Sequence, residues 1–239
     1  MIVAKAKFLL LFSLVLFAAA ASQDFESTDV TDNISLGDLS AYEDATSTIA
    51  LWLYQESASG STQDIFSKRT TGGTDSPNEM GVDSGTMYYL QASAGCGSWG
   101  TLVSVAEVVG VWVFYAGTND GVTARLYKNG VEVGTDASPL VTVCDNASNV
   151  KFGNSDAGLP YDGRLAYVSF YNRALTATEV RQIMVFPGSI SDGLVSFHTL
   201  MNSGNQNDLG QNNYDGTNTG AADSANGPPV YLSSGGQNG

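Results

Sequence analysis

The chain has 239 residues, of which 24 are Asp or Glu and 10 are Lys or Arg, so its formal net charge at pH 7 is −14. Nucleic acids and anionic membrane surfaces bind through clustered basic side chains, and Lys68-Arg69 is the only adjacent basic pair in the sequence. Composition therefore excludes nucleic acid as a partner. A single histidine also excludes a histidine-rich metal site.

The N-terminus has the pattern of a secretory signal peptide. Lys5 and Lys7 precede an apolar run over residues 8–17, and small residues follow over 18–22. The apolar run is shorter than the roughly 20 residues needed to cross a bilayer. We expect residues 1–22 to be removed, which leaves a secreted, extracellular protein with no membrane span.

Ten short segments rich in β-branched and aromatic residues follow, separated by Gly, Asn, Asp and Ser. In chain order they are 48–55, 64–70, 86–93, 100–108, 111–117, 123–129, 131–135, 150–154, 163–172 and 193–200. Many short strands with turn residues between them predict an all-β antiparallel sandwich or barrel. Trp52 and Trp112 lie among apolar neighbours within these segments and are predicted core residues.

One helical element interrupts the β pattern. Thr176 and Glu179 have the spacing of a capping box, in which each side chain satisfies a backbone donor, and this predicts a short helical turn near 176–184. No linker divides the chain. We expect residues 23–231 to form a single domain and residues 232–239 to form a flexible tail.

The chain has two cysteines, Cys96 and Cys144, and an oxidising compartment favours a disulfide between them. Two sequons place candidate N-glycosylation sites at Asn33 and Asn146. Because Asn146 follows Cys144 closely, we expect that segment to be an exposed loop.

Three blocks of the sequence carry a family resemblance, and its last block, "YNRALTATE", is quite specific. The matching residues are Trp112, Ala116, Asp120-Gly121, Leu126-Tyr127, Asn129-Gly130, Gly163, Leu165, Val168, Tyr171 to Leu175 and Glu179. Over roughly residues 34–190 the chain resembles the laminin-G-like, concanavalin A-like jelly-roll family of the lectin/glucanase superfamily. The resemblance implies a jelly-roll β-sandwich, in which Asn129-Gly130 forms a two-residue hairpin turn.

The segment 192–220 resembles an element that often opens such domains, although here it comes last. This order predicts either a strand that closes the sandwich beside the N-terminal segment 33–40, or a permuted arrangement. A second domain is disfavoured because few residues remain.

The glucanase relatives carry a Glu-x-Asp-x-x-Glu strand, which places two catalytic carboxylates on one face. This pattern is missing here, and the seven glutamates are scattered along the sequence. We therefore expect the protein not to be an enzyme.

Carbohydrate binding is the function that the resemblance implies most often. Aromatic faces and amide side chains hold sugars, so the candidate ligand-binding residues are Trp99, Tyr88, Tyr161 and Asn154, although core or turn positions explain each of them equally well.

A calcium site is the cofactor hypothesis. Calcium prefers six to eight oxygen ligands from turns rich in Asp, Asn and Gly. Asp208, Asn213 and Asp215 lie close together in sequence, and Asp156 and Asp162 come from a second such turn. Ordinary β-turns have the same composition, because Asx side chains bind their own backbone.

Two functions therefore remain open. The first is a secreted binding or adhesion module that recognises carbohydrate or glycoprotein at the cell surface or in the extracellular matrix. The second is a structural subunit of an extracellular filament, coat or particle, which binds copies of itself through strand edges. The N-terminal stretch 23–33 and the late segment 193–200 are candidates for strand exchange.

Overall fold

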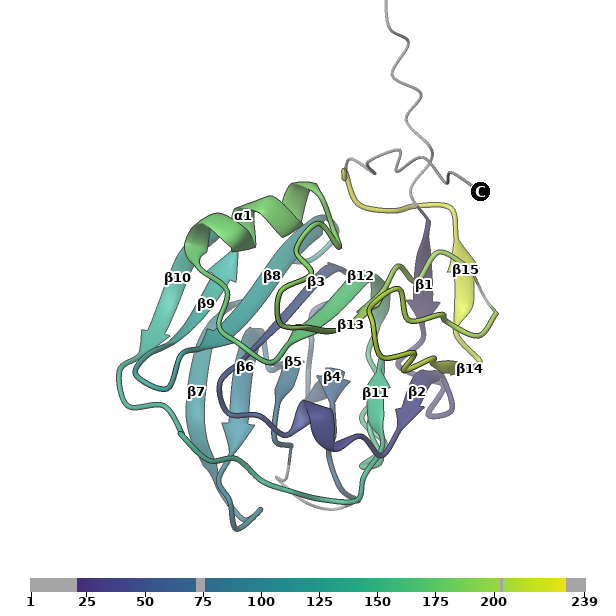
Figure 1. Ribbon diagram of the computed structural model, residues 1–239. Coiled ribbons are helices and arrows are strands. Elements are labelled where there is room, and N and C mark those ends of the chain that lie inside the picture. The colour runs from purple at the N-terminus through teal and green to yellow at the C-terminus, as the bar shows by residue number, and fades with distance from the viewer. Residues whose placement is uncertain (1–20, 72–75, 203, 231–239) are drawn as a thin grey trace, which may run out of the picture.

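The computed structural model describes residues 21–71, 76–202 and 204–230, which form two antiparallel β-sheets packed face to face (Figure 1). The strands are β1 (Ser22–Phe25), β2 (Asn33–Gly37), β3 (Ser47–Gln55), β4 (Gln63–Ser67), β5 (Glu79–Asp83), β6 (Thr86–Ala92), β7 (Trp99–Ala106), β8 (Trp112–Asn119), β9 (Ala124–Lys128), β10 (Val131–Asp136), β11 (Val150–Phe152), β12 (Gly163–Tyr171), β13 (Leu194–His198), β14 (Thr217–Thr219) and β15 (Ala222–Ser224). A 3-10 helix, η1 (Ser40–Tyr42), and an α-helix, α1 (Ala177–Val185), complete the described elements. The predicted all-β sandwich is confirmed.

We call the eight-stranded layer sheet A and the seven-stranded layer sheet B. Sheet A has the order β10-β9-β8-β3-β12-β1-β15, and β13 also pairs with β12; sheet B has the order β14-β2-β11-β4-β5-β6-β7. Strand β12 accommodates both β1 and β13 along one edge, since β1 pairs near Leu165 and β13 pairs from Val168 onward. Tyr167, with a φ of 53°, marks the irregularity between the two halves.

The main core lies between the two sheets, where alternate side chains of each strand meet. Strand β3 contributes Leu51 and Leu53, and β6 contributes Met87 and Tyr89. The Tyr89 ring lies so close to Gly117 that a Cβ on that glycine would be 2.4 Å from the ring. This contact explains why β8 has no side chain at that position.

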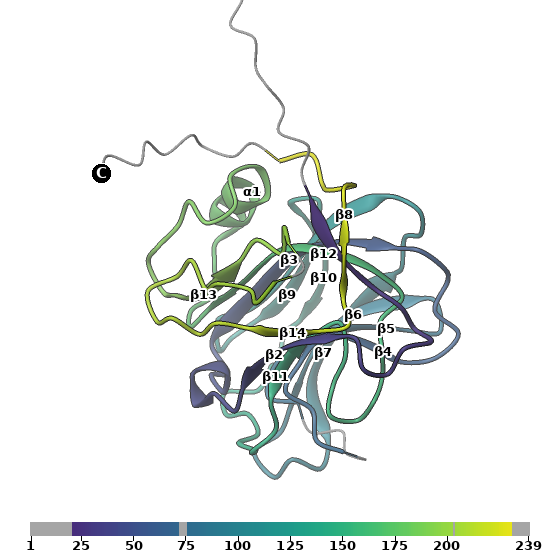
Figure 2. The same cartoon turned by 90° about the vertical axis from the view of Figure 1, so that its right-hand side faces the viewer.

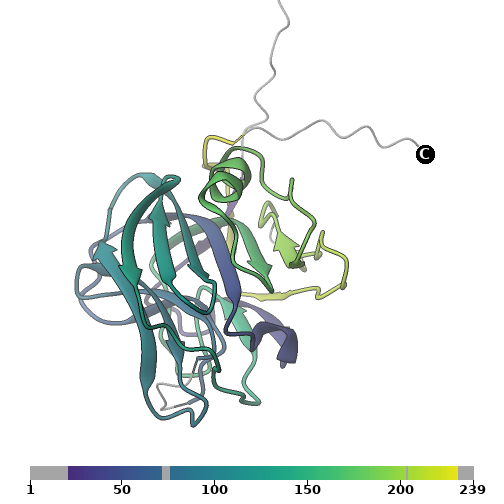
Figure 3. The ribbon, with the colours of Figure 1, turned by 60° about the vertical axis from the view of Figure 1, so that its left-hand side comes forward.

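A second core seals the outer face of sheet A. Helix α1 lies against this face (Figure 1; Figure 3), and its buried Val180 and Ile183 pack with Trp52 and Phe114. The Trp52 indole Nε1 donates to the carbonyl of Met184 at 3.2 Å. Helix and sheet are thus joined by both apolar contact and a hydrogen bond.

The local predictions for the helix and the hairpin are confirmed. The Thr176 side chain accepts a hydrogen bond from the Glu179 backbone, and Glu179 returns the interaction to the Thr176 backbone. Asn129 and Gly130 have φ values of 50° and 75°, as a primed two-residue turn requires.

The last segment closes the sandwich beside the first, as predicted. Strand β14 pairs with β2, and β15 pairs with β1, so the two ends of the domain lie side by side (Figure 2). Strand β1 begins at Ser22, the last residue of the predicted signal peptide, and Ser22 is buried. The predicted signal peptide up to residue 20, and the predicted tail, lie outside the described residues. No helix within the described ranges is long and apolar enough to cross a membrane.

Candidate functional site

The outer face of sheet B carries a pocket of about 310 Å³ over strands β5, β6 and β7. It is lined by Thr62, Asp83, Ser84, Thr86, Tyr88, Leu90, Trp99, Leu102 and Ser104. This volume is near the lower limit of small-molecule pockets, about 300–1,000 Å³, and matches a small ligand or the terminal unit of a longer one.

Strand alternation produces the pocket. Met87 and Val103 belong to the core between the sheets, so their neighbours along β6 and β7 point outward. Tyr88 lies opposite Ser104 in the register of the two strands, and Leu90 lies opposite Leu102. The side chains that line the pocket are therefore the outward-facing residues of regular strands.

The pocket is polar at one end, where Asp83, Ser84 and Thr86 lie at the β5–β6 turn, and apolar at the other, where Leu90, Leu102 and Trp99 lie. Leu90 is buried, whereas Trp99 and Leu102 are 50% and 49% exposed and offer their surfaces to solvent. The polar lining residues are Thr62, Asp83, Ser84, Thr86 and Ser104. Such a pocket suits a ligand that has both an apolar face and hydrogen-bonding groups.

Tyr88 is held in place from below. Its ring crosses β5 above Gly81, where a Cβ would lie 2.3 Å from the hydroxyl oxygen. The hydroxyl donates to Oε1 of Glu79 at 2.8 Å and lies 3.5 Å from Oδ1 of Asp64. Because the hydroxyl is committed to a buried carboxylate, Tyr88 contributes its ring to the pocket.

The carboxylates beneath Tyr88 form an unusual buried cluster. Asp64 and Glu79 are almost completely buried, and Nη1 of Arg69 lies 3.4 Å and 3.5 Å from them. Burial raises the pKa of Asp64, and burial together with the Asp64 charge raises the pKa of Glu79 well above its ordinary value of 4.5. Sequence analysis missed this pair, which comes from two neighbouring strands.

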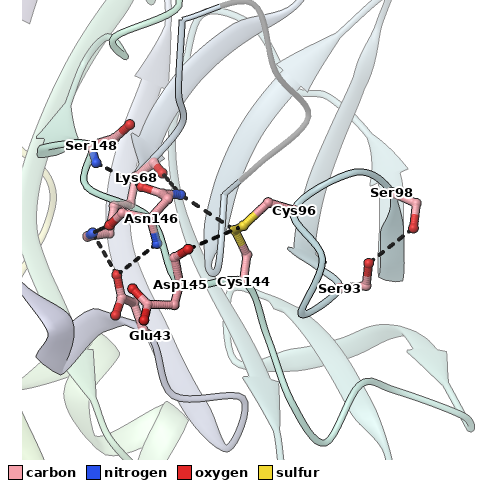
Figure 4. The surroundings of a disulfide bond; sticks show 9 residues. All are labelled: Glu43, Lys68, Ser93, Cys96, Ser98, Cys144, Asp145, Asn146 and Ser148. Carbon is pink, nitrogen blue, oxygen red and sulfur yellow. Dashed lines mark hydrogen bonds and ion pairs between the residues drawn. A yellow bond between two sulfur atoms is a disulfide. The ribbon is translucent and has the colours of Figure 1, made fainter.

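A disulfide fixes the loop that leads to Trp99. Cys96, in the β6–β7 loop, is bonded to Cys144, which confirms the predicted pairing (Figure 4). The Cys144 amide donates to the carbonyl of Ala92 at 3.0 Å, so a backbone hydrogen bond ties the same two segments together. The wall of the pocket that carries Trp99 is therefore attached to a segment far along the sequence.

The predicted glycosylation sites differ in their surroundings. Asn146 does lie in a loop, but its Nδ2 donates to the carbonyl of Lys68 at 2.9 Å, so the side chain points inward (Figure 4). The Lys68 ammonium group forms ion pairs with Asp38 and Glu43, both at 2.7 Å. Asn33 is half-buried at the start of β2, and its Nδ2 donates to the carbonyl of Thr31 at 2.6 Å.

Comparison with known proteins identifies the family. Residues 28–181 match the model of the concanavalin A-like lectin/glucanases superfamily. The chain belongs to this superfamily. No curated protein matches its sequence.

One solved structure shares the fold of this domain over most of its length. A putative carbohydrate-binding protein from Bacteroides ovatus superposes with a TM-score of 0.68 at 14% identity, over 89% of this chain and 61% of that one. A heptameric SAP-like pentraxin from Limulus polyphemus matches with a TM-score of 0.49 at 18% identity, over 69% of this chain and 82% of that one. The chain spans less than two thirds of the first structure.

Two of the four predicted ligand-binding residues meet at the pocket. Trp99 and Tyr88 both line it. Tyr161 is fully buried in the core, and Asn154 is 1% exposed. The Asn154 Nδ2 donates to the carbonyl of Val30 at 2.9 Å, so its role is structural. Tyr161 and Asn154 are out of reach of a ligand, which corrects the prediction for these two residues.

The C-terminal loop does not fit a calcium ion. Oδ1 of Asp208 accepts from the Phe197 and Gly210 amides at 2.9 and 2.7 Å, and Oδ2 accepts from the Tyr214 amide at 3.0 Å. Asp215 accepts from the Asp208 amide at 2.9 Å. The turn interpretation of this composition is correct for these carboxylates. The third predicted ligand of this loop, Asn213, is exposed and has a φ of 55°.

The two candidate calcium ligands of the second turn, Asp156 and Asp162, interact with different partners. Asp156 forms an ion pair with Lys151 at 2.7 Å. Asp162 accepts hydrogen bonds from the Ser27 and Ser57 hydroxyls.

Carboxylates do gather elsewhere. The side-chain oxygens of Asp24, Glu26 and Glu56 lie within 4.8 Å of one another. Partial burial and the charges of Asp24 and Glu56 raise the pKa of Glu26. This donor set fits a hard cation in chemistry, but Arg164 already forms ion pairs with Asp24 and Glu56.

Proposed function

We propose that this superfamily member is a secreted, non-catalytic module that binds carbohydrate, free or attached to a glycoprotein, in the pocket of sheet B. The observation that carries the proposal is the half-exposed Trp99 at the apolar end of a pocket whose other end is polar. The carbohydrate or glycoprotein that it recognises lies at the cell surface or in the extracellular matrix.

The pocket and a pyranose ring have matching chemistry. A sugar has an apolar face of C–H groups and a periphery of hydroxyls. Trp99 and Leu102 supply apolar contact area, while the polar lining groups Asp83, Thr86 and Ser104 supply donors and acceptors. Pockets of this kind take their affinity from the apolar surface and their orientation from a few polar groups.

The arrangement of carboxylates supports a non-catalytic role. Glycosidases place two carboxyl groups on either side of the scissile bond, about 5–9.5 Å apart. Within the part of the chain that the structure describes, Asp83 is the one carboxylate that lines this pocket. Asp64 and Glu79 lie beneath Tyr88, where solvent and substrate do not reach them.

The disulfide supports an extracellular location, since such bonds persist in oxidising compartments. Mass spectrometry of the protein recovered from an expression medium tests this part. An N-terminus at or near residue 22 is the expected result, and retention of the full N-terminus inside the cell contradicts it.

The binding claim is tested on a glycan and polysaccharide array with the wild type and two variants. Trp99→Ala removes the exposed wall of the pocket, and Phe186→Ala removes an aromatic side chain that is 45% exposed outside it. We expect selective, competable binding by the wild type and Phe186→Ala, and its loss in Trp99→Ala. Equal binding by all three proteins, or a blank array, contradicts the proposal.

A chelator arm on the same array tests for calcium. None of the predicted calcium ligands, and none of Asp24, Glu26 and Glu56, lines the pocket. We therefore expect binding to persist in chelator. Loss of binding that returns with calcium implies that a cation acts on the pocket from a distance.

A structural subunit remains the second candidate, favoured by one observation. Strand β10 is an edge of sheet A, and its Val131 and Val133 side chains are 65% and 38% exposed. The segments predicted for strand exchange are less suitable: β1 is paired on both sides, and β13 pairs with β12. Concentration-dependent fibres or oligomers without added glycan, seen by sedimentation and electron microscopy, support this alternative.

A further inference from the structure

The charges around the pocket indicate which glycans it accepts. Among the described residues that line it there is no Lys, Arg or His, and Asp83 contributes one carboxylate. Among the described residues no cation lies within ion-pair distance of Asp83, whose carboxylate accepts a hydrogen bond from the Ser84 hydroxyl at 3.0 Å. A ligand in the pocket therefore meets an uncompensated negative charge.

The basic residue beneath the pocket does not change this balance. The guanidinium of the half-buried Arg69 lies against the buried carboxylates of Asp64 and Glu79. The positive charge of Arg69 is therefore balanced by the Asp64 and Glu79 cluster and does not offset the charge of Asp83. The chain as a whole carries a net charge of −14, which adds a long-range repulsion of anions at low salt.

On the basis of the proposed carbohydrate site, we propose that the pocket selects glycan units that are uncharged or carry an ammonium group, and rejects sialylated, sulfated and uronic-acid units, with Asp83 as the residue that sets this preference. An ionised carboxylate accepts strong hydrogen bonds from sugar hydroxyls or from an ammonium group. The same carboxylate repels a sulfate or carboxylate on the ligand. For two like charges about 4 Å apart near a protein surface, this repulsion corresponds to roughly tenfold or more in affinity.

Calorimetry on matched ligands tests the proposal, with lactose against 3′-sialyllactose and 3′-sulfolactose, and chitosan against chitin oligosaccharides. If the array identifies another neutral glycan, its sulfated or sialylated counterpart replaces the lactose series. We expect each anionic ligand to bind at least about tenfold more weakly than its neutral counterpart at low salt, and the ratio to shrink at high salt.

Two variants isolate the role of Asp83. Asp83→Asn removes the charge at the polar end of the pocket, where the residue is half-exposed, and Asp44→Asn removes one charge from an exposed position outside the pocket. The ratio between neutral and anionic ligands should fall towards one in Asp83→Asn and stay unchanged in Asp44→Asn. Equal loss of discrimination in both variants assigns the effect to net charge and overturns the role of Asp83.

The outcomes separate the two proposals. If the wild type binds neutral and anionic ligands equally, the charge preference is wrong and carbohydrate binding stands. If the wild type binds no glycan of either kind on the array or in solution, the proposed function fails and this inference fails with it.

Discussion

The outer faces of the two sheets are both built around tryptophan, yet they have opposite surroundings. Trp52 on sheet A is 6% exposed beneath α1, whereas Trp99 on sheet B is 50% exposed at the pocket. The two tryptophans differ in exposure because a later segment of the chain covers the outer face of sheet A at Trp52. Helix α1 follows β12 and returns over sheet A, while nothing in the described ranges covers Trp99. Because Trp52 is covered by α1, its side chain stabilises the fold. Because Trp99 is half-exposed, its side chain is available to a ligand.

The largest expected effect is on the covered face. Trp52→Ala removes a ring that packs against Phe114 and donates to the carbonyl of Met184. Truncation of a buried aromatic side chain costs about 3–5 kcal/mol, and we expect that loss in the free energy of unfolding measured with urea. Trp99→Ala should change stability by about 0.5 kcal/mol or less. Similar losses in the two variants contradict the comparison.

The open face is tested by affinity. Trp99→Ala should weaken binding of an array-identified glycan by about 30-fold, because truncation of an aromatic anchor at a binding site costs about 2 kcal/mol. Titration calorimetry gives the affinity, and the Phe186→Ala variant provides the control. A change of less than threefold places the ligand somewhere other than this wall.

The cluster under Tyr88 predicts a pH effect. The pKa of Glu79 is higher in the folded state than in the unfolded state, so stability is fully present below about 4.5 and is lost as pH rises towards the folded-state pKa. Glu79→Gln cannot ionise. From pH 4.5 to pH 8 the free energy of unfolding of Glu79→Gln should therefore increase relative to that of the wild type.

Urea unfolding at both pH values measures this difference. Glu132→Gln, at a side chain that is 47% exposed, is the matched control and should show no such trend. Parallel pH profiles for the wild type and Glu79→Gln contradict the buried-acid explanation. The glycan affinity of Glu79→Gln also reports whether the hydrogen bond from Tyr88 positions its ring.

The smallest expected effect concerns the helix that covers sheet A. Thr176→Ala removes the side-chain acceptor at the start of α1, and loss of such a cap costs about 1 kcal/mol. Thr176→Ser keeps the hydroxyl and should stay near the wild-type stability in the same urea measurement. Equal losses in both variants indicate that the methyl group, not the cap, matters.

Local sequence patterns predicted much of this molecule, because their causes are local. The capping box at Thr176, the turn at Asn129 and the disulfide at Cys96 each depend on a few residues or on a single pairing choice. All ten predicted segments contain strands. Five strands, β1, β2, β5, β14 and β15, were not among the predicted segments, and each has only three to five residues.

The candidate site was predicted only in part, because it depends on contacts between distant segments. The sequence left core and surface positions equally open for Trp99, which lies among glycines. Tyr161 is carried into the core by the fold of the loop after β11. Asp208 has the composition of a calcium ligand, yet the Phe197 amide eleven residues away occupies its carboxylate. The Asp64–Glu79 pair depends on the register of β4 and β5, which includes a bulge that the sequence does not reveal.

The central claim is tested most directly by following the indole N–H signals of the three tryptophans, Trp52, Trp99 and Trp112, by NMR during titration with an array-identified glycan. Single Trp→Phe variants assign the signals. If the glycan binds at Trp99, the chemical shift of the Trp99 indole signal changes in a saturable manner and the chemical shifts of Trp52 and Trp112 do not change. A saturable shift at Trp112 or Trp52 with Trp99 unmoved places the ligand on sheet A and contradicts the account.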